Sequence, residues 1–136
     1  MRIFITALVL SLFVLQCFAQ TLPNIGDTKQ SVEYGLKNSP HNFIVSSSYI
    51  DKYTYSVGGA NDYVVFIYYF RNSNTCTSFM IIPQHKDILL GLVEGYNESA
   101  IVVSPTEWRD YIEDKVISIK LLYNKENDFQ YFQITD

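Results

Sequence analysis

Cysteine is scarce in this sequence. It has only two cysteines, Cys17 and Cys76, and a single tryptophan, Trp108. If Cys17 leaves with an N-terminal leader, Cys76 has no partner for an intrachain disulfide even in an oxidising compartment. We therefore expect packing of a hydrophobic core, and not cross-links, to hold the domain together.

Basic residues are also in short supply. Ten Lys and Arg face fourteen Asp and Glu, which gives a net charge of −4, and no long block of like charge occurs. Proteins that follow a phosphate backbone concentrate Lys and Arg on one surface. The composition thus argues against a nucleic-acid partner.

Residues for metal or acid–base chemistry are few and scattered. His41 and His85 show neither the H-x-H nor the H-x-x-x-H spacing of a local zinc nucleus. A group of four acids lacks the spacing of a calcium loop; it comprises Glu107, Asp110, Glu113 and Asp114. We predict no catalytic residue, no metal site and no cofactor, and expect these acids to solvate a surface loop.

The N-terminus has the pattern of a secretory leader. Arg2 precedes an apolar run over 3–15, which is shorter than the about 20 residues of a membrane-spanning helix. Cys17 and Ala19 supply the small side chains that signal peptidase needs, so we predict a signal peptide over 1–19 and a single domain over 20–136. The product would be exported, periplasmic or secreted, without a permanent membrane span. The alternative is a lipoprotein modified at Cys17, but the residue before this cysteine, Gln16, is too large and polar for a lipobox.

Two short helices are predicted in the mature chain. Asp27 can cap a helix that ends before Pro40, and Val32 and Leu36 fall on one of its faces. Gly35 weakens this helix unless a neighbour must approach it closely. A second helix follows Pro83 and ends at Gly95 or Asn97; its apolar positions are Ile88, Leu89, Leu92, Val93 and Tyr96.

Runs of β-branched and aromatic residues predict the strands. They occupy 43–45, 53–57, 63–70, 79–82, 101–103, 116–123 and 129–134. The separators are short and turn-forming, which favours antiparallel pairing. The strand over 63–70 is apolar on both faces and is expected to be central, and Cys76 is placed with the fourth strand. The predicted class is α+β, in the order α-β-β-β-β-α-β-β-β, with about seven mostly antiparallel strands and both helices on one face.

Tyrosine is the most informative excess, with eleven residues. Each hydroxyl needs a partner, so some of these rings should lie at the surface, where rigid rings serve contact with proteins or sugars. The predicted binding residues are Tyr53, Tyr55, Tyr69 and Trp108. The alternative is that the tyrosines merely cover the half-wet face of the sheet.

The segment from Ile25 to Leu36 contains Gly26, Thr28, Val32 and Leu36 at fixed spacing. It resembles the G-x-[ST]-x-x-x-V-x-x-x-L start of small exported modules related to BamE/SmpA lipoproteins and the β-lactamase inhibitory protein. The wider layout is similar to that of uncharacterised small secreted proteins of Bacteroidetes. These resemblances imply a helix-plus-sheet module that works by contact. Neither the inhibitor's disulfides nor an acceptable lipobox is present, so no functional residue is carried over.

The sequence therefore favours a non-catalytic exported module that binds a protein or glycan through an aromatic sheet surface. One alternative is a small secreted hydrolase that uses Cys76, with His41 or His85 as its base, or an acidic pair. Another is a structural envelope protein without a specific ligand. The sequence names no partner and no oligomeric state.

Overall fold

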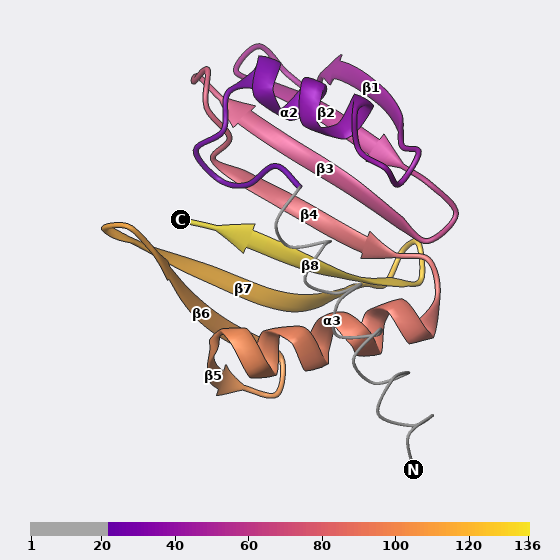
Figure 1. Cartoon of the computed structure of the whole chain (residues 1–136), viewed down its shortest axis with the longest axis vertical. Coiled ribbons are helices and arrows are strands. Elements are labelled where there is room, and N and C mark those ends of the chain that lie inside the picture. The colour runs from indigo at the N-terminus through magenta and orange to yellow at the C-terminus, as the bar shows by residue number, and fades with distance from the viewer. Residues whose placement is uncertain (1–21) are drawn as a thin grey trace.

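The computed structural model describes residues 22–136, which form one antiparallel sheet with two helices (Figure 1). The predicted leader over 1–19 lies outside the described residues. The class, α+β with an antiparallel sheet, agrees with the prediction. None of the described helices is long and apolar enough to cross a membrane.

The sheet has eight strands arranged as two four-strand meanders. The strands are β1 Ile44–Tyr49, β2 Thr54–Ala60, β3 Val64–Arg71, β4 Ser78–Pro83, β5 Ile101–Ser104, β6 Glu107–Ile112, β7 Lys115–Asn124 and β8 Phe129–Thr135. Their order across the sheet is β1-β2-β3-β4-β8-β7-β6-β5, so the meanders join where β4 pairs with β8. A helix precedes each meander along the chain, and β1 and β5 form the two edges.

Helix α2, Lys29–Lys37, precedes the first meander. Thr28 caps it, since the Thr28 Oγ1 accepts a hydrogen bond from the Ser31 amide at 3.1 Å. The predicted cap, Asp27, is wrong: its carboxylate instead accepts the Asn24 amide at 2.7 Å. Val32 and Leu36 are buried on one face of the helix, as predicted.

Helix α3, Lys86–Ser99, precedes the second meander. It runs past both predicted end points, because Gly95 and Asn97 are accommodated within it. Tyr96 extends from α3 into the core, where its ring lies 5.7 Å from that of Trp108 and 5.4 Å from that of Phe132.

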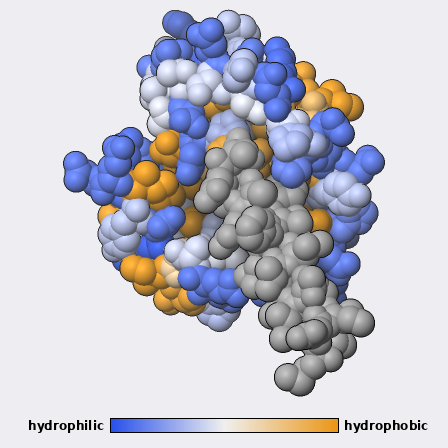
Figure 2. Space-filling view, viewed as in Figure 1, coloured by the Kyte–Doolittle hydropathy of each residue, from blue (hydrophilic) through white to orange (hydrophobic). Residues whose placement is uncertain are grey.

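Both helices lie on one face of the sheet, here called the helix face. Leu36 of α2 packs against Gly59, which pairs with Phe66, and Tyr96 of α3 packs on Phe132. The helix face of β3 is buried, and its residues are Val64, Phe66, Tyr68 and Phe70. No described element covers the opposite face, here called the open face, where Val65, Ile67 and Tyr69 are half-buried. The surface seen from the helix side is mainly hydrophilic, with scattered hydrophobic groups (Figure 2).

The prediction of about seven strands is wrong by one strand, β6, which also adds a strand to the predicted order after the second helix. This strand covers 107–112, where an acidic loop was expected. Trp108 and Ile112 alternate with more polar neighbours, and Trp108 pairs with Ile119 of β7. Three charged residues within six positions obscured the period-two pattern, so the strand escaped notice.

Candidate functional site

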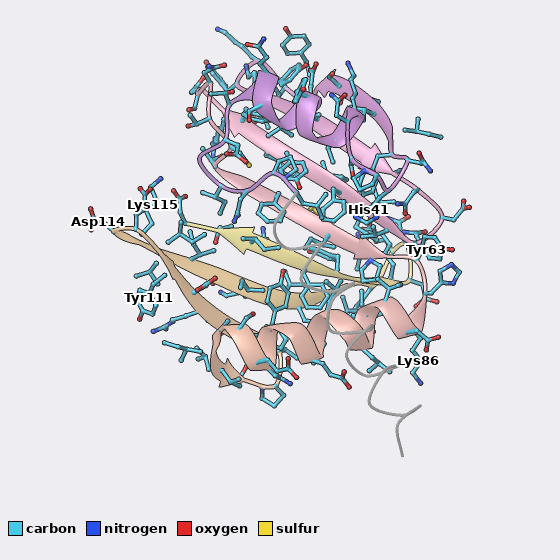
Figure 3. All side chains as sticks on the ribbon, viewed as in Figure 1. His41, Tyr63, Lys86, Tyr111, Asp114 and Lys115 are labelled. Carbon is cyan, nitrogen blue, oxygen red and sulfur yellow. The ribbon has the colours of Figure 1, made fainter. Side chains whose placement is uncertain are left out.

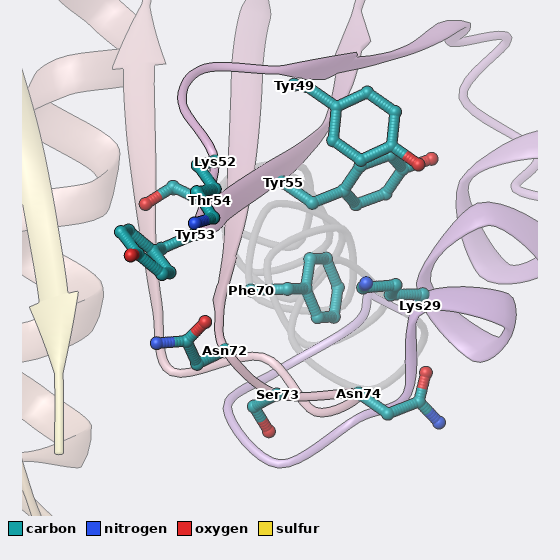
Figure 4. Close-up of a pocket in the computed structure, with 10 residues that line it drawn as sticks. All are labelled: Lys29, Tyr49, Lys52, Tyr53, Thr54, Tyr55, Phe70, Asn72, Ser73 and Asn74. Carbon is teal, nitrogen blue, oxygen red and sulfur yellow. The ribbon is translucent and has the colours of Figure 1, made fainter.

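A surface pocket lies where the start of α2 meets the β1–β2 and β3–β4 turns (Figure 4). Its volume is about 310 Å³, at the lower end of the range of about 300 to 1,000 Å³ for ligand sites. Four aromatic rings, two lysines and a run of polar turn residues line it. The turn residues are Asn72, Ser73 and Asn74. We take this pocket as the candidate site.

Three of the four aromatic rings come from neighbouring strands on the helix face, and the fourth, that of Tyr53, comes from the β1–β2 turn. Tyr55 of β2 pairs with Tyr49 of β1 on one side and with Phe70 of β3 on the other. The ring centroids lie 5.1 Å apart for Tyr49 and Tyr55, and 6.2 Å apart for Tyr55 and Phe70. Phe70 is only 1% exposed, whereas Tyr49 is 83% and Tyr53 is 54% exposed. The pocket thus has a buried aromatic floor and an exposed tyrosine rim.

Two lysines lie over these rings. Lys29, the first residue of α2, places its Nζ 4.7 Å from the ring centroid of Tyr55 and 6.0 Å from that of Phe70. Lys52 places its Nζ 5.4 Å from the ring centroid of Tyr53. Such contacts fall within the range of cation–π attraction. The ion pairs of the described residues involve Lys37 and Lys115, so neither pocket lysine pairs with a carboxylate.

Two carboxylates fix the walls of the pocket from outside. Glu33 Oε1 accepts hydrogen bonds from the Tyr55 hydroxyl and the Ser47 hydroxyl, both at 3.1 Å. Asp51 Oδ1 accepts the backbone amides of Tyr53 and Thr54 at 2.7 Å and so organises the β1–β2 turn. The hydrogen bond from the Tyr53 amide is the main cause of the lowered pKa of the Asp51 carboxyl, because it stabilises the charged carboxylate.

Backbone hydrogen bonds hold the polar wall in place. The Asn72 amide donates to the Tyr53 carbonyl at 2.8 Å, and the Lys29 amide donates to the Asn74 carbonyl at 3.1 Å. Asn72 adopts a left-handed conformation with φ of 48°, which asparagine tolerates better than most residues. The Asn72–Asn74 turn is therefore tied to both the β1–β2 turn and α2.

The structure brings only two of the four predicted binding residues into this pocket, namely Tyr53 and Tyr55. Tyr69 lies on the open face, because it pairs with Ser56 and Ser78. Its hydroxyl donates to the Met80 Sδ at 3.4 Å. Tyr68 and Tyr69 are adjacent in sequence, so they necessarily point to opposite faces of the sheet.

The prediction that Trp108 is a binding residue at the surface is wrong, because Trp108 lies in the core. Its side chain is 0% exposed, and its Nε1 donates to the Asn97 Oδ1 at 2.8 Å. The ring contacts Tyr96 of α3 and Phe132 of β8. It therefore offers no area to a ligand.

Sequence reasoning missed the rest of the pocket: Lys29, Tyr49, Lys52, Phe70 and the Asn72–Asn74 turn. Phe70 ends the strand over 63–70 that was expected to be central, but its role as the floor depends on the pairing of β2 with β3. The turn was recognised only as a separator. The one available signal was the tyrosine cluster that precedes and begins β2.

Cys76 is buried and lies just before β4, not within it. Burial is the main cause that raises the pKa of its thiol to about 12. The Sγ donates to the Ser78 carbonyl at 3.2 Å. At neutral pH the thiol is protonated, which argues against a thiolate nucleophile.

The histidines and the acids do not converge. The His85 Nε2 lies 3.0 Å from the Asp62 carbonyl oxygen. Figure 3 shows His41 and Tyr63 on the side of the molecule opposite to Tyr111 and Asp114. Within residues 22–136, no group of three or more His, Cys, Asp or Glu is placed to hold a metal ion.

Comparison with protein-family models, with curated proteins and with solved structures returns no match for this chain. The resemblance to the exported modules therefore stays a prediction, and the pocket must be interpreted from its own chemistry.

Proposed function

We propose that this protein is an exported, non-catalytic module that binds a glycan in the pocket at the start of α2. One observation carries the proposal: exposed tyrosines at the rim stand beside turn residues that the backbone holds in place. This combination supports binding of a ligand that has both apolar faces and many hydroxyl groups.

A sugar ring has this chemistry. Its C–H faces pack on aromatic rings, and its hydroxyls both donate and accept hydrogen bonds. Tyr49 and Tyr53 offer exposed rings, while the side chains of Asn72, Ser73 and Asn74 supply both donors and acceptors. The buried ring of Phe70 closes the floor and excludes water there.

The pocket favours binding over catalysis. Among the residues that line it there is no Asp, Glu, His or Cys, so it offers no carboxyl, imidazole or thiol group for acid–base or nucleophilic catalysis. Lysine remains the only ionisable group besides tyrosine. A hydrolase of the predicted alternative kind would need Cys76 or an acidic pair, and neither lines this pocket.

The proposal is tested with a glycan array and then by titration of the best hit. We expect Tyr53→Ala to weaken that affinity about tenfold, which corresponds to about 1.4 kcal/mol, because it removes one rim ring. Tyr49→Ala should act in the same direction.

Tyr63→Ala is the matched control, because Tyr63 is 58% exposed and lies outside the pocket. It should leave the affinity unchanged. Absence of any glycan hit for the wild-type protein would contradict the proposal, as would equal losses in the Tyr53 and Tyr63 variants.

A further inference from the structure

We infer that the glycan bound in this pocket is acidic and that Lys29 and Lys52 hold its anionic group, a carboxylate or a sulfate ester. This inference rests on the proposed function. Its basis is a local inversion of charge: the chain as a whole carries more acids than bases, whereas the pocket wall carries two lysines and no carboxylate.

The two ammonium groups have no anionic partner within the described residues. Each lies over a tyrosine ring, Lys29 over Tyr55 and Lys52 over Tyr53. A ring face attracts a cation but supplies no formal negative charge, so the positive charge stays available to a ligand. An ammonium group also has three N–H donors, and hydrogen bonds between charged groups are stronger than neutral ones.

The carboxylates nearest in sequence are engaged elsewhere. Glu33 accepts from Tyr55 and Ser47, and it pairs with Lys37 at 3.8 Å. Asp51 accepts two backbone amides of the β1–β2 turn. Asp27 accepts the Asn24 amide. Each of these three carboxylates already accepts hydrogen bonds from other groups, and none of them lines the pocket.

The neutral and the charged residues of the pocket would recognise different parts of one ligand. Rim tyrosines and turn amides suit the neutral face and hydroxyls of a sugar, whereas the lysines suit its charged substituent. A neutral glycan would leave both ammonium groups without a counter-ion. We therefore expect discrimination by charge in addition to binding by stacking.

The experiment compares oligogalacturonate with the same oligosaccharide after reduction of its carboxyl groups, and dextran sulfate with neutral dextran. For the wild-type protein we expect about tenfold tighter binding of at least one charged ligand over its neutral counterpart. This preference should shrink between about 50 mM and about 500 mM NaCl, because salt screens exposed charges. Whichever charged ligand is preferred identifies the anionic group.

The double variant Lys29→Gln/Lys52→Gln should lose the preference and still bind the neutral ligand. Lys86→Gln is the matched control, because Lys86 is the first residue of α3 as Lys29 is of α2. It should keep the preference, and so should Lys29→Arg, which retains the charge. Thermal unfolding of each variant shows whether the fold is intact.

The outcomes separate the two proposals. Equal binding of charged and neutral ligands would overturn the acidic-ligand inference and leave glycan binding standing. A preference that survives in the double variant would also overturn it. Absence of binding to all four ligands would contradict the inference, and the glycan array then decides independently whether the proposed function fails too.

Discussion

Trp108 is the largest fully buried side chain of the described residues. We expect Trp108→Ala to lower the free energy of unfolding by about 3 to 5 kcal/mol, because it leaves a cavity between α3 and the sheet. Trp108→Phe should cost less, since the phenyl ring fills part of the space and exposed Asn97 can bond to water. Urea denaturation measures both values. A cost below about 1 kcal/mol for the alanine variant would contradict the complete burial of Trp108.

Single residues were also where sequence reasoning was least reliable. The excess of tyrosine is visible in the composition, and Tyr53 and Tyr55 do line the pocket. The positions of Tyr69 and Trp108 could not be predicted in the same way. The position of Tyr69 depends on the pairing of β3 with β4, and that of Trp108 depends on contacts with α3, such as the hydrogen bond to Asn97. A short stretch of sequence around either residue does not show these tertiary contacts.

At the scale of elements, the glycines of the two helices behave differently. A Cβ placed on Gly91 of α3 would meet no atom within 4 Å, whereas a Cβ on Gly35 of α2 would lie 3.0 Å from the Pro23 Cγ. Close approach of a neighbour thus accounts for Gly35, as its place in a helix suggested.

We predict that Gly91→Ala raises the free energy of unfolding by about 0.5 to 1 kcal/mol, because alanine loses less backbone entropy in a helix. Gly35→Ala should give no such gain, since Pro23 must shift to admit the methyl group. Parallel urea titrations of the two variants provide the comparison. Equal stabilisation by both substitutions would show that the contact with Pro23 is unimportant.

Both helices and seven of the strands could be located from sequence. Helical spacing marked Val32 and Leu36, and β-branched runs marked strands such as β3. The exact bounds were less accessible: β1 continues through three serines, which have little strand preference of their own. Pairing with β2 holds this segment extended. This pairing is a tertiary contact, so the local sequence of β1 does not predict it.

At the scale of the whole molecule, burial of ionisable groups makes stability depend on alkaline pH. Burial is the main cause that raises the pKa of Cys76 to about 12, and it also raises the pKa of Tyr68 and Tyr96. The ordinary pKa values are 9.0 for cysteine and 10.0 for tyrosine. Above about pH 9 the unfolded chain therefore binds fewer protons than the folded chain.

It follows that stability is fully present below about pH 9 and falls as the pH rises toward about 12. Each such group contributes a slope of up to about 1.4 kcal/mol per pH unit. Unfolding free energies at about pH 8, 9.5 and 11 measure the effect. Tyr68→Phe should make the decline shallower, whereas Tyr111→Phe, at an exposed position, serves as the control. Stability that is constant or rising over this interval would contradict the prediction.

The sheet ends in two strands that carry no charge, β1 with the sequence Ile-Val-Ser-Ser-Ser-Tyr and β5 with Ile-Val-Val-Ser. Such edges lack the charged residues and prolines that usually discourage pairing with another chain. The net charge of −4 makes copies of the chain repel one another in solution. Because concentrated salt screens that repulsion, we expect it to favour pairing of these edge strands between copies of the chain.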